Sequence, residues 1–279
     1  MGSGFTEAPL AIFTTLAPMG ACAFIVLALA FSRNSYDEEQ TARIDKMTII
    51  PLAFMVVGFI AAFFHLANPL AAMGAIAGLG RAPLTNEVAV AVATMVVGIV
   101  YWLAARAGKL EGGARKGFLV LLAVMSVVMA MFCGFAYTLQ TVPSWNTPWT
   151  VVQMIGYGLL GGSAVGALTL RAAGVELLGK EVFAQGVVGL VVALVGFGGQ
   201  IAAAGSMSNI WGTAASQVPM IWILFAVLAV CAVAVVLIER QGGQKPLAVS
   251  MASVACCLAA VGIFLARIGF YGLYMGVAL

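Results

Sequence analysis

The sequence predicts an all-α polytopic membrane protein, a bundle of eight transmembrane helices. Of its 279 residues, 63% are hydrophobic and only 8% are charged, whereas soluble domains carry about 25% charged residues. Eight apolar runs are each long enough to supply the roughly 20 residues that cross the hydrocarbon core of a bilayer. The basic residues fall mainly in alternate gaps between these runs. We expect helices throughout, because backbone polar groups in lipid must be hydrogen-bonded within their own segment.

We expect one integral membrane domain over residues 1–279. Its spans are predicted at about residues 10–31, 47–66, 87–105, 117–137, 149–170, 183–204, 218–238 and 247–273. The first run follows a segment that contains Glu7 and no basic residue, and it is long enough to span, so we expect a retained helix and not a cleaved signal peptide. No hydrophilic stretch is long enough to form a soluble domain.

The distribution of basic residues predicts the orientation of the protein. Eleven of the 13 Lys and Arg residues lie in the first, third, fifth and seventh connections: Arg33, Arg43, Lys46, Arg106, Lys109, Arg115, Lys116, Arg171, Lys180, Arg240 and Lys245. The other connections contain only Arg81, and Arg267 lies within the last span. The positive-inside rule therefore places both termini on the outer, periplasmic side of a bacterial inner membrane.

Strongly polar residues are predicted at the outer ends of the spans. Such residues are costly in lipid and therefore mark candidate functional sites. They are His65, Glu87, Gln153, Gln200 and Arg267, and Asn68 and Asn86 flank the loop that joins His65 to Glu87. We find no comparable group in the inner halves of the spans. If the helices pack as a bundle, these side chains can line one shallow cavity.

Each of these residues also has a purely structural interpretation. His65 can lie at the membrane interface, and Glu87 can cap a helix N-terminus, where a carboxylate is electrostatically favoured. Gln153 and Gln200 can make only interhelical hydrogen bonds. Arg267 requires a carboxylate, a carbonyl or water, and Glu87 is a partner at the matching depth.

The outer connections are nearly free of charge. Arg81 is the only charged residue between Ala67 and Asn86, and residues 138–148 and 205–217 have none but contain Trp145 and Trp211. A partner protein that covers this face would explain the missing charge. The alternative is that the tryptophans lie at the lipid headgroups and that short loops need no charge.

Two further patterns favour packing over chemistry. Gly156-x-Gly158-x-x-Gly161 matches a dinucleotide-binding fingerprint, but that fingerprint requires a preceding strand, and here it lies inside an apolar run. Small residues spaced by four, Gly158, Gly162 and Gly166, instead predict a stripe against which another helix packs closely. The five cysteines lie within spans and are expected to be buried small apolar residues: Cys22, Cys133, Cys231, Cys256 and Cys257.

The sequence contains a single histidine. A membrane haem with two axial histidines is therefore not expected, and a zinc or di-iron site would lack ligands. Any redox role depends on a diffusible cofactor or on a cofactor in a partner subunit.

Several motifs together resemble the membrane anchor (C) subunits of bacterial dimethyl sulfoxide reductases. The motifs extend over nearly the whole sequence: MGSG followed by Glu7 and Pro9, Gly58-Phe59-Ile60-Ala61, His65-Leu66-x-x-Pro69, Leu84-x-Asn86-Glu87, Thr141-Val142-Pro143-x-Trp145, and Arg267 with Phe270-Tyr271-Gly272-Leu273-x-Met275. One departure is Tyr274, where the family pattern has a histidine.

The resemblance implies one subunit of a three-subunit oxidoreductase. A molybdopterin catalytic subunit reduces an S-oxide or N-oxide, and an iron–sulfur subunit relays electrons. Both dock on the outer face. The anchor does not act on the terminal substrate; it binds and oxidises menaquinol near the periplasmic face. The resemblance and the polar residues together suggest His65, Glu87 and Arg267 as catalytic groups. The quinol would also be bound by Asn68, Asn86, Arg81, Gln153, Gln200 and Tyr271.

These residues suit the chemistry of quinol oxidation, which releases two protons and two electrons. The imidazole of His65 titrates near neutral pH and can accept a quinol proton. Glu87 can orient His65 or accept the second proton. Arg267 can hold Glu87 ionised or stabilise a developing quinolate.

Three alternatives make different demands on the sequence. A secondary transporter would show internal repeats, broken helices and a polar site near the midplane of the membrane. Pro18 and the glycine-rich fifth and sixth spans are compatible with broken helices. The polar residues, however, gather at one face and not at the midplane. A purely structural anchor leaves the grouping of His65, Glu87 and Arg267 unexplained. A proton-pumping, quinone-coupled anchor would need a polar path to the inner face, where the half-spans look apolar.

Overall fold

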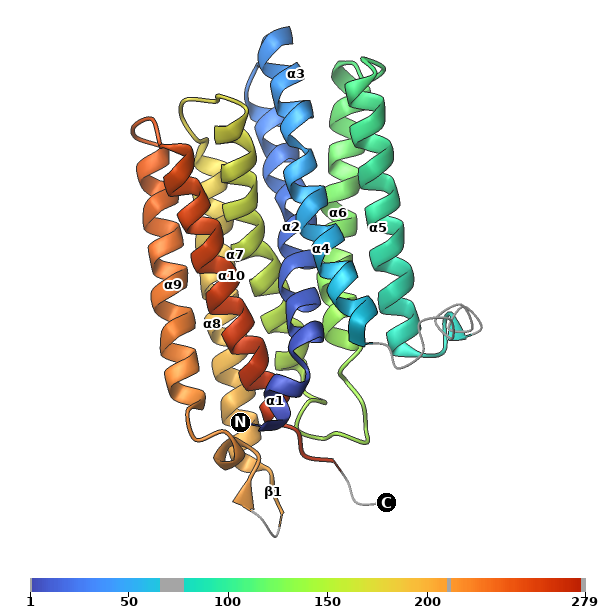
Figure 1. Cartoon of the computed structure of the whole chain (residues 1–279), viewed down its shortest axis with the longest axis vertical. Coiled ribbons are helices and arrows are strands. Elements are labelled where there is room, and N and C mark those ends of the chain that lie inside the picture. The colour runs from blue at the N-terminus through green and yellow to red at the C-terminus, as the bar shows by residue number, and fades with distance from the viewer. Residues whose placement is uncertain (1, 66–77, 210–211, 277–279) are drawn as a thin grey trace.

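The computed structural model describes residues 2–65, 78–209 and 212–276, with side chains described from residue 4 onward and to residue 64 in the first of these ranges. Eight of its helices are long and apolar enough to cross a membrane, which confirms the predicted all-α class and the number of spans. Figure 1 shows them side by side in alternating directions, with both marked termini at the same end of the bundle. We call this end the terminal end and the opposite end, with α3 (Glu38–Met47), the basic end.

The long helices follow the predicted spans closely. They are α2 (Ala8–Arg33), α4 (Ile49–His65), α5 (Pro83–Arg106), α6 (Gly112–Phe135), α7 (Pro148–Ala172), α8 (Lys180–Ser206), α9 (Ile221–Gly242) and α10 (Val249–Gly272). Short elements lie at the terminal end: α1 (Gly2–Thr6), the antiparallel strand pair β1 (Ser208–Asn209) and β2 (Gly212–Thr213), and the 3-10 helix η2 (Ala215–Gln217).

The helix starts differ from the prediction by one to five residues, and two of these differences concern polar residues. The second span is preceded by the polar helix α3, which Asp37 caps: its side chain accepts a hydrogen bond from the Gln40 backbone N–H at 2.6 Å. Helix α5 begins at Pro83, a residue favoured at the first helical position because it needs no N–H partner. Glu87 therefore lies inside the helix, and its interpretation as an N-terminal cap is wrong.

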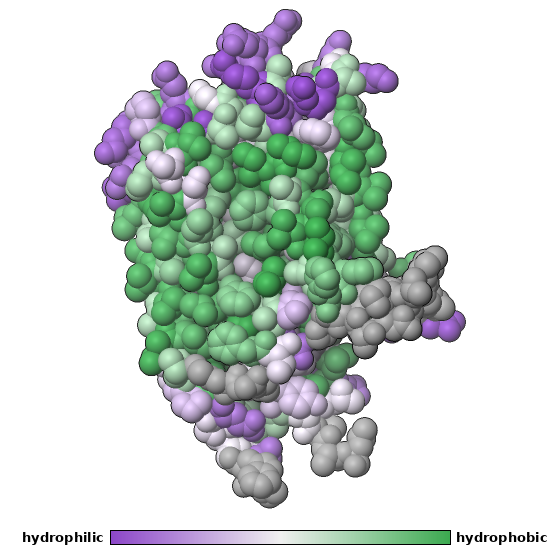
Figure 2. All heavy atoms as spheres, viewed as in Figure 1, coloured by the Kyte–Doolittle hydropathy of each residue, from purple (hydrophilic) through white to green (hydrophobic). Residues whose placement is uncertain are grey.

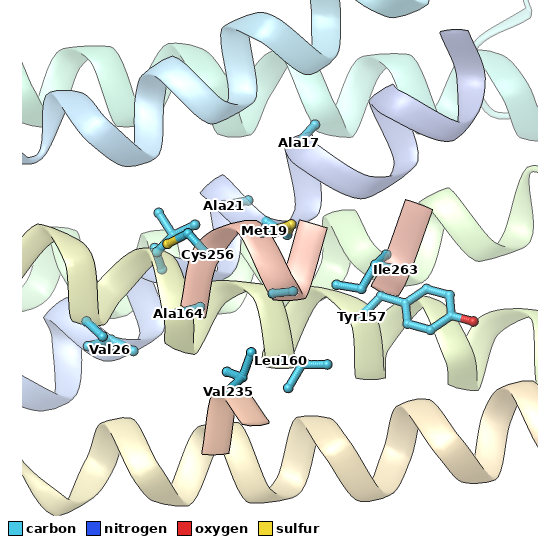
Figure 3. Close-up of a cluster of buried hydrophobic side chains, with 14 of the residues drawn as sticks. Ala17, Met19, Ala21, Val26, Tyr157, Leu160, Ala164, Val235, Cys256 and Ile263 are labelled. Carbon is cyan, nitrogen blue, oxygen red and sulfur yellow. The ribbon is translucent and has the colours of Figure 1, made fainter. Parts of the chain in front are cut away.

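Helices α2 and α7 form the centre of the bundle. In each, 78% of the most apolar 18-residue window is buried, against 28–39% in the other six spans. Figure 3 shows Met19 and Val26 of α2 in the same cluster of buried side chains as Tyr157, Leu160 and Ala164 of α7. A large share of the contacts in the core therefore involves these two helices.

Glycines allow α7 to pack closely against α2, as the sequence predicts. A Cβ atom on Gly158 would lie 2.9 Å from Cys22 Sγ, and one on Gly162 would lie 2.5 Å from the backbone carbonyl carbon of Cys22. Real Cβ atoms do not approach other atoms so closely, so only glycine fits. The dinucleotide-like motif thus lies inside a packed helix.

The surface of the bundle matches a lipid environment. Figure 2 shows a broad apolar belt and a concentration of hydrophilic residues at the basic end. Large apolar side chains of the peripheral helices point outward, such as Phe64 (79% exposed) and Val230 (70% exposed). Four cysteines are buried as expected, but Cys257 is exposed on α10, because it lies on the outer side of that helix.

Candidate functional site

A fully buried arginine joins three helices at the terminal end. Arg267 of α10 has 0% of its surface exposed. Its Nε donates a hydrogen bond to Thr14 Oγ1 of α2 at 2.9 Å, and its Nη2 donates to the Tyr271 hydroxyl at 2.8 Å. The Tyr271 hydroxyl lies 2.6 Å from the Tyr137 hydroxyl, at the end of α6. The guanidinium thus connects α2, α6 and α10.

Aromatic rings surround the same guanidinium. Its central carbon lies 4.4 Å from the ring centre of Phe270, 4.7 Å from that of Tyr271 and 5.0 Å from that of Tyr137. Rings at these distances attract a cation through their electron-rich faces. Hydroxyls and rings therefore stabilise Arg267, and it forms no ion pair with Glu87 within 4 Å among the described residues.

Glu87 lies close to this arginine but is not bonded to it. Its side chain on α5 is 2% exposed, the Cys133 thiol of α6 lies beside its carboxylate, and it interacts electrostatically with Arg267. Its Oε1 has no hydrogen-bond partner among the described residues, and neither has Nη1 of Arg267. Leaving buried polar atoms unpaired is costly. A bound polar group would relieve that cost at both side chains.

Gln153 reaches the arginine through a tyrosine on its own helix. Its Oε1 accepts a hydrogen bond from the Tyr157 hydroxyl at 3.1 Å, and Tyr157 interacts electrostatically with Arg267. Gln153 is 0% exposed and its Nε2 has no partner among the described residues. The structure thus gathers Glu87, Gln153, Arg267 and Tyr271 from α5, α7 and α10. We call them, with Thr14 and Tyr137, the arginine cluster.

Gln200 belongs to a different network. Its Oε1 accepts hydrogen bonds from the hydroxyls of Thr147 at 2.6 Å and Thr150 at 3.0 Å, and its Nε2 donates to the Ser144 carbonyl at 2.5 Å. These bonds hold the connection between α6 and α7 against α8. Gln200 is fully buried within this network.

The remaining predicted residues border the loop before α5. Asn86 Oδ1 accepts a hydrogen bond from the Gly80 backbone N–H at 2.7 Å, which stabilises the turn where Gly80 has φ of 78°. Arg81 is exposed. The backbone of His65 ends α4; its side chain and Asn68 lie outside the described residues.

Two residues of this region were not singled out from the sequence, and a third, Trp145, was placed at a partner or lipid interface. Thr14 and Tyr137 are common residue types, and nothing in the sequence marks them. Only the packing of the helices shows that Thr14 bonds Arg267 and that Tyr137 bonds Tyr271. Trp145 packs inward: its Nε1 donates to the Phe270 carbonyl at 3.0 Å, and its ring stacks on Phe270 with centres 5.4 Å apart. Tyr274 is 49% exposed and its ring centre lies 5.2 Å from that of Trp145.

The expectation of apolar inner half-spans is wrong. Gln185 of α8 is 6% exposed and Glu239 of α9 is 1% exposed, and both lie toward the basic end of the bundle. Helix α9 continues to Gly242, past its predicted end at residue 238. Glu239 therefore lies within the helix, on its buried side. A buried ion pair between Arg115 and Asp45 also lies at this end.

In the part of the protein that the structure describes, no group of three or more His, Cys, Asp and Glu residues could hold a metal ion. The polar groups at the terminal end are instead suited to a small organic ligand with hydroxyl or carbonyl oxygens. Carboxylate, amide and guanidinium groups accept and donate hydrogen bonds to such oxygens.

Comparison with known proteins places the sequence in a family. The family of DMSO reductase anchor subunits (DmsC) matches residues 1–273. Over 286 aligned positions, the sequence is 32% identical to the C subunit of the anaerobic dimethyl sulfoxide reductase of Escherichia coli, with 100% of this protein and 99% of that one covered.

Two partial relatives agree. The YnfH subunit of an anaerobic dimethyl sulfoxide reductase of Escherichia coli is 32% identical over 62% of this protein and 61% of its own length. The C subunit of the anaerobic dimethyl sulfoxide reductase of Haemophilus influenzae is 27% identical over 57% of both proteins. The protein is therefore a multi-pass membrane protein of anaerobic respiration that belongs to the DMSO reductase anchor subunit family.

Proposed function

We propose that this protein is the quinol-oxidising anchor of a dimethyl sulfoxide reductase-type complex. Menaquinol binds at the terminal end of the bundle and is oxidised there. Its electrons pass to an iron–sulfur subunit docked on the same face, and a molybdopterin subunit uses them to reduce the terminal substrate. The names of the relatives support the assembly, since they are subunits of anaerobic dimethyl sulfoxide reductases.

The unpaired oxygen of buried Glu87 beside the charge of Arg267 carries this proposal. A quinol hydroxyl needs an acceptor for its hydrogen bond and then for its proton, and the anion that forms needs a donor. Glu87 supplies the acceptor and the free N–H of Arg267 supplies the donor. Thr14 and Tyr271 hold the guanidinium in place.

His65 is proposed as the first proton acceptor. It is the last residue of α4 and is the single histidine of the sequence. Helix α4 ends and α5 begins at the terminal end, so the backbones of His65 and Glu87 lie at the same end of the bundle. Glu87 then accepts the second proton or orients the imidazole.

The other predicted residues are proposed to have supporting roles. Gln153 and Tyr271 border the quinol head group, and Asn68 lies in the loop that follows His65. Asn86 shapes the turn before α5, Gln200 fixes the connection between α6 and α7, and Arg81 remains on the surface.

The basic residues support a periplasmic location for this site. The connections rich in Lys and Arg lie at the opposite, basic end, and the positive-inside rule places such connections in the cytoplasm. Electrons then leave directly to the partner docked on the periplasmic face. Protons are released on the side where substrate reduction consumes them, so turnover is nearly electroneutral.

Quinol oxidation by the assembled complex tests the proposal. We expect His65→Leu and Glu87→Gln to lower the rate with a menaquinol analogue by about 10²-fold or more, the range of general base catalysis. Substrate reduction with a dye that donates electrons directly to the soluble subunits should stay normal, because the variants leave those subunits intact.

Glu111→Gln is the matched control, because Glu111 is an exposed carboxylate at the basic end. It should leave both activities unchanged. Normal quinol turnover in a fully assembled His65→Leu complex would remove His65 from the site.

A further inference from the structure

Glu239 is a buried carboxylate far from the proposed quinol site. Its side chain is 1% exposed, and neither of its carboxylate oxygens has a hydrogen-bond partner among the described residues. It faces Ser163 of α7, ten residues along from Gln153, which corresponds to about 15 Å on the helix axis. The two sites are therefore separate.

Among the described residues, no Lys or Arg lies within 4 Å of this carboxylate. Glu239 packs against the backbone of Gly186 on α8, where a Cβ atom would collide with Oε2. Cys256 of α10, itself buried, is a titratable group within electrostatic reach. The Ser163 hydroxyl beside it donates its hydrogen bond to the Leu160 carbonyl at 2.8 Å.

An isolated ionised carboxylate in an apolar interior costs far more free energy than a neutral carboxylic acid. Ser163, Gly186 and Cys256 offer no charge that would offset that cost. The neutral acid instead needs only one proton and fits the space that Gly186 leaves open. The surroundings of Glu239 therefore favour a bound proton over any negative charge.

We propose that Glu239 is a proton-binding site that exchanges protons with the water at the basic end of the bundle. Its backbone lies three residues before the end of α9 at Gly242, about one helical turn from that end. The connection before α8 is bound to this end of α9, where the Leu178 N–H donates to the Gly242 carbonyl at 2.9 Å. Small movements of this connection admit water to the carboxyl group.

A second buried polar side chain lies next to Gly186 in the sequence. Gln185 precedes Gly186 on α8 and donates hydrogen bonds from Nε2 to the carbonyls of Cys22 and Leu159, both at 3.1 Å. Its Oε1 has no partner among the described residues. Ser163 and Gln185 are thus uncharged, and both can form hydrogen bonds with a water molecule that enters this part of the bundle.

Carbodiimide labelling of the complex in oriented membrane vesicles tests this site. Dicyclohexylcarbodiimide is an apolar reagent that modifies protonated carboxyls in membrane interiors, and mass spectrometry of the Glu239 peptide measures the adduct. We expect modification of Glu239 that decreases as the pH rises on the basic side and does not change with the pH on the terminal side. The Glu239→Gln variant should lose the adduct.

Two comparisons make the result decisive. Glu176→Gln, which alters an exposed carboxylate in the connection before α8, should leave the Glu239 adduct unchanged. Glu239→Gln should keep the thermal stability of the complex, because glutamine mimics the neutral acid. Wild-type labelling remains readable even if that variant fails to assemble.

Three outcomes would overturn the proposal. The first is an unmodified Glu239 at every pH, and the second is labelling that follows the pH of the terminal side. The third is protection by Na⁺ at constant pH, which would make Glu239 part of a metal-cation site. None of these outcomes bears on quinol oxidation at the arginine cluster.

Discussion

At the residue scale, Arg267 shows how one side chain can organise the end of a helix bundle. It is fully buried, yet hydroxyls and aromatic faces hold it in place of a carboxylate. Such an arrangement keeps the nearby Glu87 oxygen unpaired among the described residues. The local structure therefore preserves hydrogen-bonding capacity that a direct ion pair would use.

Tyr271→Phe should weaken the arginine cluster. The change removes the hydroxyl that accepts from Arg267 and bonds Tyr137, and it leaves a buried charged donor without its partner. We expect a loss of about 1–3 kcal/mol in stability, the cost of an unsatisfied buried group. Thermal unfolding of the purified complex measures this loss. Tyr274→Phe at the half-exposed neighbouring ring should change nothing; equal losses in both variants would contradict the role of the hydroxyl.

Two glutamines should separate ligand binding from support. The Nε2 of Gln153, close to Tyr157, has no hydrogen-bond partner among the described residues. The amide of Gln200 is instead hydrogen-bonded to Ser144, Thr147 and Thr150. We expect Gln153→Leu to raise the KM for quinol. Gln200→Leu should lower the thermal stability and leave the KM unchanged. Steady-state kinetics with a menaquinol analogue distinguish them, and a raised KM in Gln200→Leu alone would reverse the assignment.

At the element scale, the close packing of α2 against α7 depends on missing side chains. Gly162 lies so near Cys22 that a methyl group cannot fit without moving a helix. We expect Gly162→Ala to destabilise the complex by about 1–3 kcal/mol, as overpacking of a dense interior does. Thermal unfolding in detergent measures it.

The matched control is Gly117→Ala on α6, where a Cβ atom would meet nothing within 4 Å. That change should be neutral or slightly stabilising, because alanine favours a helix over glycine. A Gly162→Ala complex as stable as the Gly117→Ala complex would mean that α2 can shift to make room.

Hydropathy predicted the existence of the eight helices but not their ends. Burial in lipid requires a long apolar run, and composition alone reveals such a run. The starts and stops depend on local features such as Pro83, and on packing of polar residues such as Glu239, which lies beyond the predicted span but inside the bundle. The same limit applies to the candidate site. The positions of Glu87 and Arg267 within their predicted spans place both residues at the same end of the bundle. Only the packing of the helices shows that Thr14 and Tyr271 form hydrogen bonds with the arginine.

At the scale of the whole molecule, the two ends of the bundle differ in charge. The basic end carries the Lys- and Arg-rich connections, and the terminal end carries connections with almost no charge. The ring of Trp145 at the terminal end packs against Phe270 of the same protein, so it stabilises the fold and is not part of a free docking surface. The absence of charge therefore remains the main reason to expect a covering protein there.

Labelling with a membrane-impermeant maleimide should test both the orientation and the covering partner. Ser208→Cys adds a thiol to an exposed strand at the terminal end, and Gly113→Cys adds one to an exposed position at the basic end. In spheroplasts that contain the anchor without its partners, we expect Ser208→Cys to react and Gly113→Cys to react only after lysis. When the partners are present, Ser208→Cys should become protected if the iron–sulfur subunit docks on that face, as proposed above. Reaction of Gly113→Cys in intact spheroplasts would reverse the orientation and move the quinol site to the cytoplasmic side. A Ser208→Cys thiol that still reacts in the complete complex would mean that the uncharged loops face the lipid headgroups. The partner interface would then lie elsewhere on the terminal end.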